Sequence, residues 1–172
     1  TIDAPTGLLV LPHFEGAATP YMDSQSQGAI VGLNTRTTTF EIYRALMEGV
    51  TYEMRLNMER LRDAGIGISA LYATGGGARS ESWLQMKADI LGVDIVSMGA
   101  AQSGTLGCVM LAGVASGIYR DLREAAGVFV RTDRRYAPRP DRSMAYQPYY
   151  ERYRRMYQAV KYINTGRRGD IE

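Results

Sequence analysis

Three consecutive glycines, Gly75, Gly76 and Gly77, form the part of this sequence best suited to hold a ligand. They lie between a short apolar run that ends near Tyr72 and an amphipathic segment that begins near Glu81. This order predicts a strand, a tight turn and the start of a helix. Because glycine has no side chain, a phosphate or a flat ring can approach the backbone, and the first N–H groups of the helix attract an anion. The segment therefore points to nucleotide binding.

The glycines alone leave two interpretations open, a ligand-binding turn and a plain connection between strand and helix. A short glycine run is a weak signal, and here the two interpretations are evenly balanced. No Gly-Lys-Ser/Thr follows, so the segment is not a P-loop. The spacing also differs from the G-x-G-x-x-G of dinucleotide-binding folds.

Other side chains capable of chemistry are few. His13 is the only histidine and Cys108 the only cysteine. A Ser-His-Asp triad or a histidine metal cluster would need companions that the sequence does not offer, so we predict a structural role for His13. Cys108 lies in an apolar stretch and is predicted to be an inert core cysteine, in preference to a nucleophile paired with histidine. Asp23 is expected either to form an Asx turn or to face a cleft between domains.

The elements that must position the glycine turn alternate between strands and helices, which is typical of an α/β chain. We expect short strands at 8–11, 29–33, 68–73, 93–96 and 128–131. We expect helices at 38–64, 82–91, 103–117, 121–126 and 146–163. The first two helices each open on a predicted capping box, Thr38 with Glu41 and Ser82 with Gln85.

Three of these helices carry further information. The first has apolar residues spaced by three or four, at Phe40, Tyr43, Met47, Val50, Met54, Met58 and Leu61. The helix at 103–117 is small and apolar almost all round, which predicts a fully buried helix. The last helix carries tyrosines at helical spacing, at Tyr146, Tyr150, Tyr153 and Tyr157, and these are predicted to belong to the core. Its arginines leave a nucleic-acid interface as an alternative, but the interleaved acidic residues favour an ordinary solvated face.

Length and composition predict one soluble globular domain over residues 1–172, and residues 164–172 are expected to form a flexible tail. Hydrophobic residues make up 45% and charged residues 22%, close to the globular average. The formal net charge of +2 is too small to predict a nucleic-acid or membrane partner. No apolar run reaches the roughly 18 residues of a membrane helix, and no secretory signal is present. The single cysteine agrees with a cytoplasmic location. The first residue, Thr1, suggests a piece of a longer protein.

Five segments together resemble the C-terminal part of the FGGY family of carbohydrate kinases, and most of all its xylulose kinase branch. They are 11–20 (LPHFEGAATP), 28–33 with 41–49, 74–83 (TGGGARSESW), 102–112 and 146–157. The resemblance covers nearly the whole chain in register. Glu81 stands where some members have an asparagine near the adenine, and Gln102 stands where the family has an acidic residue. The family fold is the actin-like, ribonuclease H-like ATPase architecture, of which this chain would be most of the second domain.

The resemblance implies ATP-dependent phosphorylation of a sugar hydroxyl, with xylulose or a related ketose as substrate and Mg²⁺ on the phosphates. The implied nucleotide-binding positions are Gly75, Gly76, Gly77, Ala78, Ser80 and Glu81. No catalytic and no metal-binding residue is implied within this chain, because the catalytic aspartate, the Mg²⁺ and most sugar contacts belong to other parts of these kinases. We therefore expect the chain alone to be inactive. The alternative is a non-catalytic nucleotide-binding or regulatory module on the same fold.

The implied partners are ATP, a small sugar and the N-terminal domain of a parent chain. Nucleic acid and membranes are not expected as partners. A domain separated from the rest of its protein exposes apolar surface. A second copy of this chain is therefore a further candidate partner, in a homo-oligomer.

Overall fold

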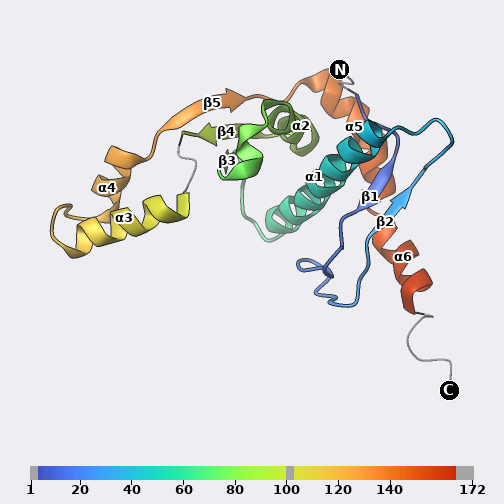
Figure 1. Ribbon diagram of the computed structural model, residues 1–172, viewed down its shortest axis with the longest axis horizontal. Coiled ribbons are helices and arrows are strands. Elements are labelled where there is room, and N and C mark those ends of the chain that lie inside the picture. The colour runs from blue at the N-terminus through green and yellow to red at the C-terminus, as the bar shows by residue number, and fades with distance from the viewer. Residues whose placement is uncertain (1–3, 100–102, 166–172) are drawn as a thin grey trace. The chain divides into compact units, whose positions relative to one another are not determined.

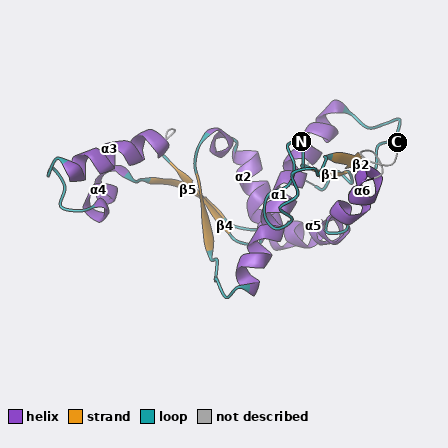
Figure 2. Ribbon diagram, turned by 90° about the horizontal axis from the view of Figure 1, so that it is seen from below, coloured by secondary structure: helices purple, strands orange, loops and turns teal. Residues whose placement is uncertain are grey.

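The structure is a computed structural model that describes residues 4–99 and 103–165 (Figure 1). Its contacts divide the chain into two compact units. Unit 1 holds the described residues of Thr1–Ile68, Asp89–Gly92 and Pro138–Glu172, and unit 2 holds those of Ser69–Ala88 and Val93–Ala137. Both units combine helices with short strands (Figure 2), as the predicted α/β class requires.

Unit 1 is built from a two-stranded sheet and three helices. Strand β1 (Leu9–Leu11) pairs antiparallel with β2 (Ala29–Val31). The helices are α1 (Thr39–Asp63), α5 (Pro140–Tyr153) and α6 (Met156–Thr165). The capping box predicted for α1 is confirmed: the Thr38 N–H donates to the Glu41 carboxylate at 2.8 Å, and the Glu41 N–H donates to the Thr38 hydroxyl at 3.2 Å.

The core of unit 1 forms where β1, α1 and α5 meet. Val10 and Ala45 are fully buried, and the Tyr52 ring of α1 lies 5.4–6.4 Å from three tyrosine rings of α5. Those rings belong to Tyr146, Tyr150 and Tyr153, so the prediction that they are core residues is confirmed. Gly49 lets α1 approach β1, because a Cβ atom there would lie 2.3 Å from the Val10 carbonyl oxygen.

The buried face of α1 is not the apolar stripe identified in the sequence. Phe40, Tyr43, Val50 and Leu61 of that stripe are exposed, although Met58 is buried. The small residues Ala45 and Gly49 face β1 instead. Two charged residues, Arg44 and Glu48, are buried beside them.

The buried charges of α1 satisfy one another. Arg44 donates to the Tyr146 hydroxyl at 2.9 Å and to the Glu48 carboxylate at 3.3 Å. Glu48 also accepts from the Thr6 hydroxyl at 2.8 Å. Burial nevertheless raises the pKa of Glu48 above its ordinary value and raises that of Tyr146 to about 12. A sequence pattern based on apolar residues alone misses such a face.

The single helix predicted over 146–163 is wrong, because the structure has two. Helix α5 begins earlier, with Pro140 in its first turn, where a proline needs no N–H partner. It ends at Tyr153, where the Arg155 N–H bonds to the Arg152 carbonyl in a tightened last turn. Asn164 and Thr165 belong to α6, and the rest of the tail predicted at 164–172 lies outside the described residues.

Unit 2 is built around a three-stranded sheet of order β3-β4-β5. Its strands are β3 (Ala70–Ala73), β4 (Asp94–Met98) and β5 (Thr132–Tyr136). Strand β4 is parallel to β3 and antiparallel to β5. Helix α2 (Glu81–Leu91), whose last residues belong to unit 1, connects β3 to β4, and α3 (Ser103–Ala115) and α4 (Leu122–Phe129) lie between β4 and β5 in the chain.

The strand predicted at 128–131 is wrong. Val128 and Phe129 end α4, where the Phe129 ring meets the Tyr119 ring edge-on at 5.8 Å. The strand forms later, from the polar sequence TDRRY of β5. Its backbone is fixed to β4 by Ser97, whose hydroxyl accepts from the Arg134 N–H at 3.0 Å.

Helix α3 forms as predicted, but it is not buried. Val109 is 45% exposed and Leu111 58% exposed, and Cys108 is exposed rather than in the core. The buried residue of α3 is Gly113, where a Cβ atom would lie 2.7 Å from the Tyr119 ring. The helix therefore packs closely along one side only. None of the described helices is both long and apolar enough to cross a membrane.

Candidate functional site

The glycine run forms a tight turn at the carboxyl end of β3. Gly75 has φ +82° and ψ −167°, a backbone conformation that glycine adopts without the strain other residues suffer. A single 3₁₀ turn, η1 (Gly76–Arg79), follows, and the Ala78 N–H donates to the Gly75 carbonyl at 3.1 Å. Helix α2 begins at Glu81. The predicted order of strand, turn and helix is confirmed.

The capping residue of α2 is Ser80, not Ser82 as the sequence suggested. The Trp83 N–H points to the Ser80 hydroxyl at 3.4 Å, and the Leu84 N–H donates to the Ser80 carbonyl at 2.9 Å. The predicted partner Gln85 instead donates from its side chain to the Ala137 carbonyl at 2.9 Å. The helix starts two residues early because the serine that follows η1 is already extended, at φ −92°.

The backbone of the turn is accessible at two of its three glycines. A Cβ atom built on Gly75 or Gly76 meets no heavy atom of the described residues within 4 Å. A Cβ atom on Gly77 would lie 3.2 Å from the Trp83 ring. Gly75 and Gly76 therefore leave room for a ligand, whereas Gly77 allows the turn to pack on α2.

A cavity of about 380 Å³ adjoins this turn within unit 2. Four residues of the turn and of α2 line one side: Gly75, Ala78, Arg79 and Glu81. The ends of β4 and β5 line the other with Ser97, Met98, Gly99, Asp133 and Tyr136. Of the six predicted nucleotide-binding residues, Gly75, Ala78 and Glu81 thus line the cavity, Gly76 and Gly77 shape the turn, and Ser80 caps the helix.

The charges around this cavity are unevenly placed. Arg79 is exposed on the turn, next to the start of α2. Glu81 pairs with Arg134 at 2.9 Å, and the Arg134 guanidinium lies 5.3 Å from the centre of the Tyr136 ring. Asp133 accepts a hydrogen bond from Ser97 at 3.3 Å. An anion is therefore favoured at the turn and disfavoured beside the Asp133 carboxylate.

The start of α3 also lies beside the turn. The hydroxyls of Thr74 and Ser103 are hydrogen-bonded to each other, and Ser103 is the first residue of α3. The positive end of this helix dipole adds to that of α2. Gln102, which the family resemblance singled out, lies outside the described residues.

The wall formed by β4 and β5 is the part of the site that the sequence did not suggest. Its residues follow the glycine turn by some 20 to 60 positions, and TDRRY has none of the apolar alternation expected of a strand. One signal was available, since β3 and β4 are parallel and ligands bind at the carboxyl ends of parallel strands. Across residues 4–99 and 103–165, no three His, Cys, Asp or Glu side chains gather in a way that could hold a metal ion.

His13 and Asp23 lie in unit 1, where both have structural partners. His13 is 3% exposed, and its Nδ1 atom lies 2.8 Å from the Ser26 hydroxyl. Asp23 accepts from the Gln25 N–H at 3.0 Å, which is the predicted Asx turn.

Comparison with known proteins gives a consistent result. A model of the C-terminal domain of the FGGY family of carbohydrate kinases matches residues 2–116. The xylulose kinase of Bacillus subtilis is 32% identical over 159 residues, which cover 92% of this chain and 32% of that protein. The glycerol kinase of Ralstonia pickettii is 39% identical over 121 residues, 70% of this chain and 24% of that protein.

Solved structures agree with these sequence matches. The ligand-bound xylulose kinase from Lactobacillus acidophilus superposes with a TM-score of 0.81 at 32% identity, over 95% of this chain and 34% of that one. A xylulose kinase from Brucella ovis gives a TM-score of 0.83 at 30% identity, over 95% of this chain and 34% of that one. The chain thus spans about a third of the length of the relatives that it matches.

Proposed function

The chain belongs to the FGGY family of carbohydrate kinases, and we propose that it is the C-terminal nucleotide-binding part of an ATP-dependent kinase that phosphorylates a sugar hydroxyl. Its fold is that of the C-terminal domain of these sugar kinases, the actin-like, ribonuclease H-like ATPase architecture. The observation that carries the proposal is the open backbone of Gly75 and Gly76 beside the 380 Å³ cavity of unit 2.

The turn is suited to the phosphates of ATP and the cavity to its nucleoside. Backbone N–H groups at the turn and at the start of α2 donate to phosphate oxygens, and Arg79 adds a positive charge nearby. The carboxylates of Glu81 and Asp133 line the same cavity, and Asp133, on the wall opposite the turn, disfavours phosphate there and so favours it at the turn. Both carboxylates already have partners, Arg134 and Ser97. We therefore expect the Mg²⁺ of the nucleotide to be held mainly by parts of the kinase outside this chain.

The proposed substrate is xylulose or a related ketose, on the names of the xylulose kinases that this chain resembles. Phosphoryl transfer also needs a base that accepts the proton of the sugar hydroxyl and a binding site for the sugar. We assign both to the N-terminal part of the parent kinase. The exposed apolar residues of α3 are the surface on which we expect that part to pack. The 172-residue chain alone is then inactive.

Nucleotide binding by the chain itself can be tested with two matched variants. Gly75→Val places a branched side chain where the phosphates would lie. Gly65→Val is the control, because Gly65 also has φ +82° and open space around a Cβ atom, but lies in unit 1 after α1. Isothermal titration with ATP should show at least about tenfold weaker binding for Gly75→Val and unchanged binding for Gly65→Val. Equal affinities of the two variants for ATP would show that the turn is not part of the nucleotide site.

Catalysis needs a separate test in the parent kinase. If the full-length protein releases ADP only when a sugar is present, and the 172-residue chain releases none, the proposed kinase activity is supported. Nucleotide binding without turnover in the full-length protein would instead indicate a non-catalytic nucleotide-binding or regulatory module.

A further inference from the structure

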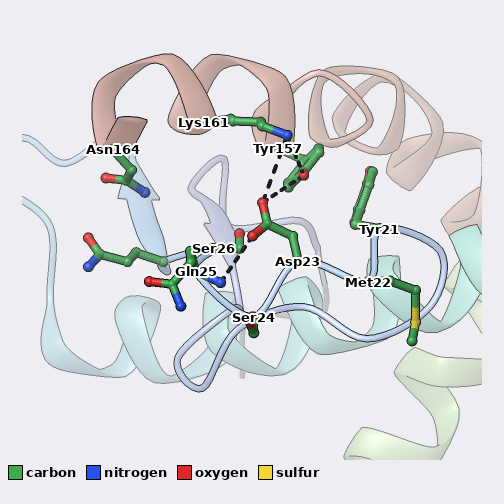
Figure 3. Close-up of a pocket in the computed structure, with 10 residues that line it drawn as sticks. Tyr21, Met22, Asp23, Ser24, Gln25, Ser26, Tyr157, Lys161 and Asn164 are labelled. Atoms are coloured by element: carbon green, nitrogen blue, oxygen red, sulfur yellow. Dashed lines mark hydrogen bonds and ion pairs between the residues drawn. The ribbon is translucent and has the colours of Figure 1, made fainter. Parts of the chain in front are cut away.

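We propose that unit 1 carries a binding site for a neutral polyhydroxylated molecule, of the size of a sugar or polyol, between the loop of residues 21–27 and α6. This inference goes beyond the proposed function and uses no residue of the glycine turn. The cavity there has a volume of about 500 Å³. That volume lies within the range of small-molecule sites, roughly 300–1,000 Å³. Figure 3 shows its lining residues, which come from the loop on one side and from α6 on the other.

The loop that forms one wall is held in a fixed shape. Its start is closed by two backbone hydrogen bonds between Ala17 and Asp23, at 2.8 and 2.9 Å. The Ser26 hydroxyl is held by a hydrogen bond with the Nδ1 atom of the buried His13, 2.8 Å away. Met22 adopts φ +48°, a left-handed conformation that residues other than glycine rarely adopt. A loop so constrained presents its side chains without further ordering on binding.

Each wall carries one charge, Asp23 on the loop and Lys161 on α6, and the two charges already neutralise each other. The Tyr157 hydroxyl donates to the Asp23 carboxylate at 2.8 Å, and the Lys161 ammonium lies 4.0 Å from the same carboxylate oxygen (Figure 3). The hydrogen bond from Tyr157 holds the pKa of Asp23 below its ordinary value, so the carboxylate is ionised at neutral pH. The Asp23 carboxylate would repel an anion, and the Lys161 ammonium would repel a cation. A neutral ligand meets neither penalty.

The remaining polar groups suit hydroxyls. The Asn164 side chain has a buried Nδ2 atom with no hydrogen-bond partner among the described residues. In Figure 3 this side chain points from α6 towards the loop that carries Gln25. The carboxamide of Gln27 also lines the cavity. Carboxamides both donate and accept, and a ligand with several hydroxyls can do the same. A buried donor without a partner calls for such a ligand or for water.

An aromatic surface completes the site. Tyr21 stacks on Tyr157 with ring centres 3.8 Å apart and an angle of 22° between the rings. Both residues line the cavity. The Tyr157 ring is 5% exposed and supports the half-buried Tyr21 ring, which offers an apolar surface for the C–H face of a sugar or polyol, while the Tyr157 hydroxyl keeps its bond to Asp23.

The experiment is a ¹H–¹⁵N titration of the labelled 172-residue chain with glycerol, xylitol and D-glucose. At least one probe should give saturable shifts of the side-chain amide signals of Asn164 and Gln25, while the backbone signals of Gly75 and Gly76 stay unchanged. Asp23→Asn should weaken the binding at least fivefold, and Asn164→Leu should do so by removing the carboxamide that donates to the ligand. Asp141→Asn is the matched control, because its carboxylate is exposed on α5 and should not affect binding.

The same titration contains the outcomes that would overturn the proposal. They are no saturable shift with any of the three probes, equal binding by Asp23→Asn and Asp141→Asn, and saturation by inorganic phosphate or Mg²⁺ in place of the polyols. Amide spectra of each variant show whether it is folded, so that loss of binding is not mistaken for loss of structure. ATP binding at the glycine turn is measured separately, so the two sites can fail independently.

Discussion

The core of unit 1 and helix α3 of unit 2 are both rich in apolar residues, yet only the first is buried. In unit 1, Tyr52 of α1 and Tyr146, Tyr150 and Tyr153 of α5 pack together and are at most 2% exposed. In α3, Val109 and Leu111 are about half exposed. The difference teaches that an apolar helix is buried only when the chain supplies a surface for it. Unit 1 contains that surface itself. Under the proposed function, the surface that covers α3 belongs to another part of the kinase.

The largest effect is expected at Tyr52. Tyr52→Ala leaves a cavity among the tyrosine rings and should lower the free energy of unfolding by about 3–5 kcal/mol. Tyr52→Phe should change it by less than about 1 kcal/mol, because the Tyr52 hydroxyl is buried without a hydrogen-bond partner among the described residues. Urea unfolding of the chain measures both. A small effect of Tyr52→Ala would show that the unit 1 core is looser than its burial indicates.

The second effect concerns a buried charge in unit 1. Asp89 is 1% exposed and accepts from the Arg139 guanidinium at 2.6 Å. Arg139→Ala should cost about 2–4 kcal/mol of unfolding free energy, because it removes the guanidinium that pairs with the buried Asp89 charge. The control is Arg120→Ala in unit 2, whose pair with Asp121 is exposed and should be worth less than about 1 kcal/mol. Similar costs for the two variants would contradict the contrast between the units.

A third effect depends on pH. Burial raises the pKa of Glu48 above its ordinary value of 4.5, so the folded state holds this proton more tightly than the unfolded state. The free energy of unfolding should therefore fall as the pH rises from 4.5 through the raised pKa. Glu48→Gln should remove that slope, which urea unfolding at a series of pH values detects. Unchanged slopes in the wild-type chain and in Glu48→Gln would show that Glu48 is solvated.

The smallest effect in the isolated chain is expected at Leu111. Leu111→Ala should change the free energy of unfolding by less than about 0.5 kcal/mol, because the side chain is 58% exposed. In the full-length parent kinase the same substitution should cost about 2–5 kcal/mol if α3 is covered there. An equally small cost in both proteins would mean that the parent kinase leaves this face uncovered.

Local signals in the sequence predicted the parts of the fold that depend on local interactions. The capping box of Thr38 and Glu41 gave the start of α1, and the three glycines gave the turn after β3. Ser82 and Gln85 have the same spacing as a capping box, but the backbone was already extended at Ser80. The sequence pattern could not separate these two serines, because both hydroxyls can cap a helix.

Features that depend on distant contacts were missed. The buried face of α1 includes Arg44, whose partner Tyr146 is 102 residues away in the chain, and Glu48, whose partner Thr6 is 42 residues away. The polar strand β5 pairs antiparallel with β4, about 40 residues earlier in the chain, and Ser97 of β4 adds a bond to its backbone. The exposure of Cys108 depends on what covers α3. The second wall of the glycine-turn cavity was missed for the same reason.

The packing of Gly77 against the Trp83 ring has an optical consequence. Trp83 is the only tryptophan among the 172 residues, and the Lys87 ammonium lies 4.2 Å from its ring centre. Light of a wavelength that only tryptophan absorbs therefore excites this one ring, on helix α2, which follows the glycine turn. Indole emission responds to nearby charge and to water, so a phosphate bound at the turn, as proposed, would change the wavelength or intensity of emission from this single ring. The chain thus carries its own fluorescent reporter of the turn, with no dye attached.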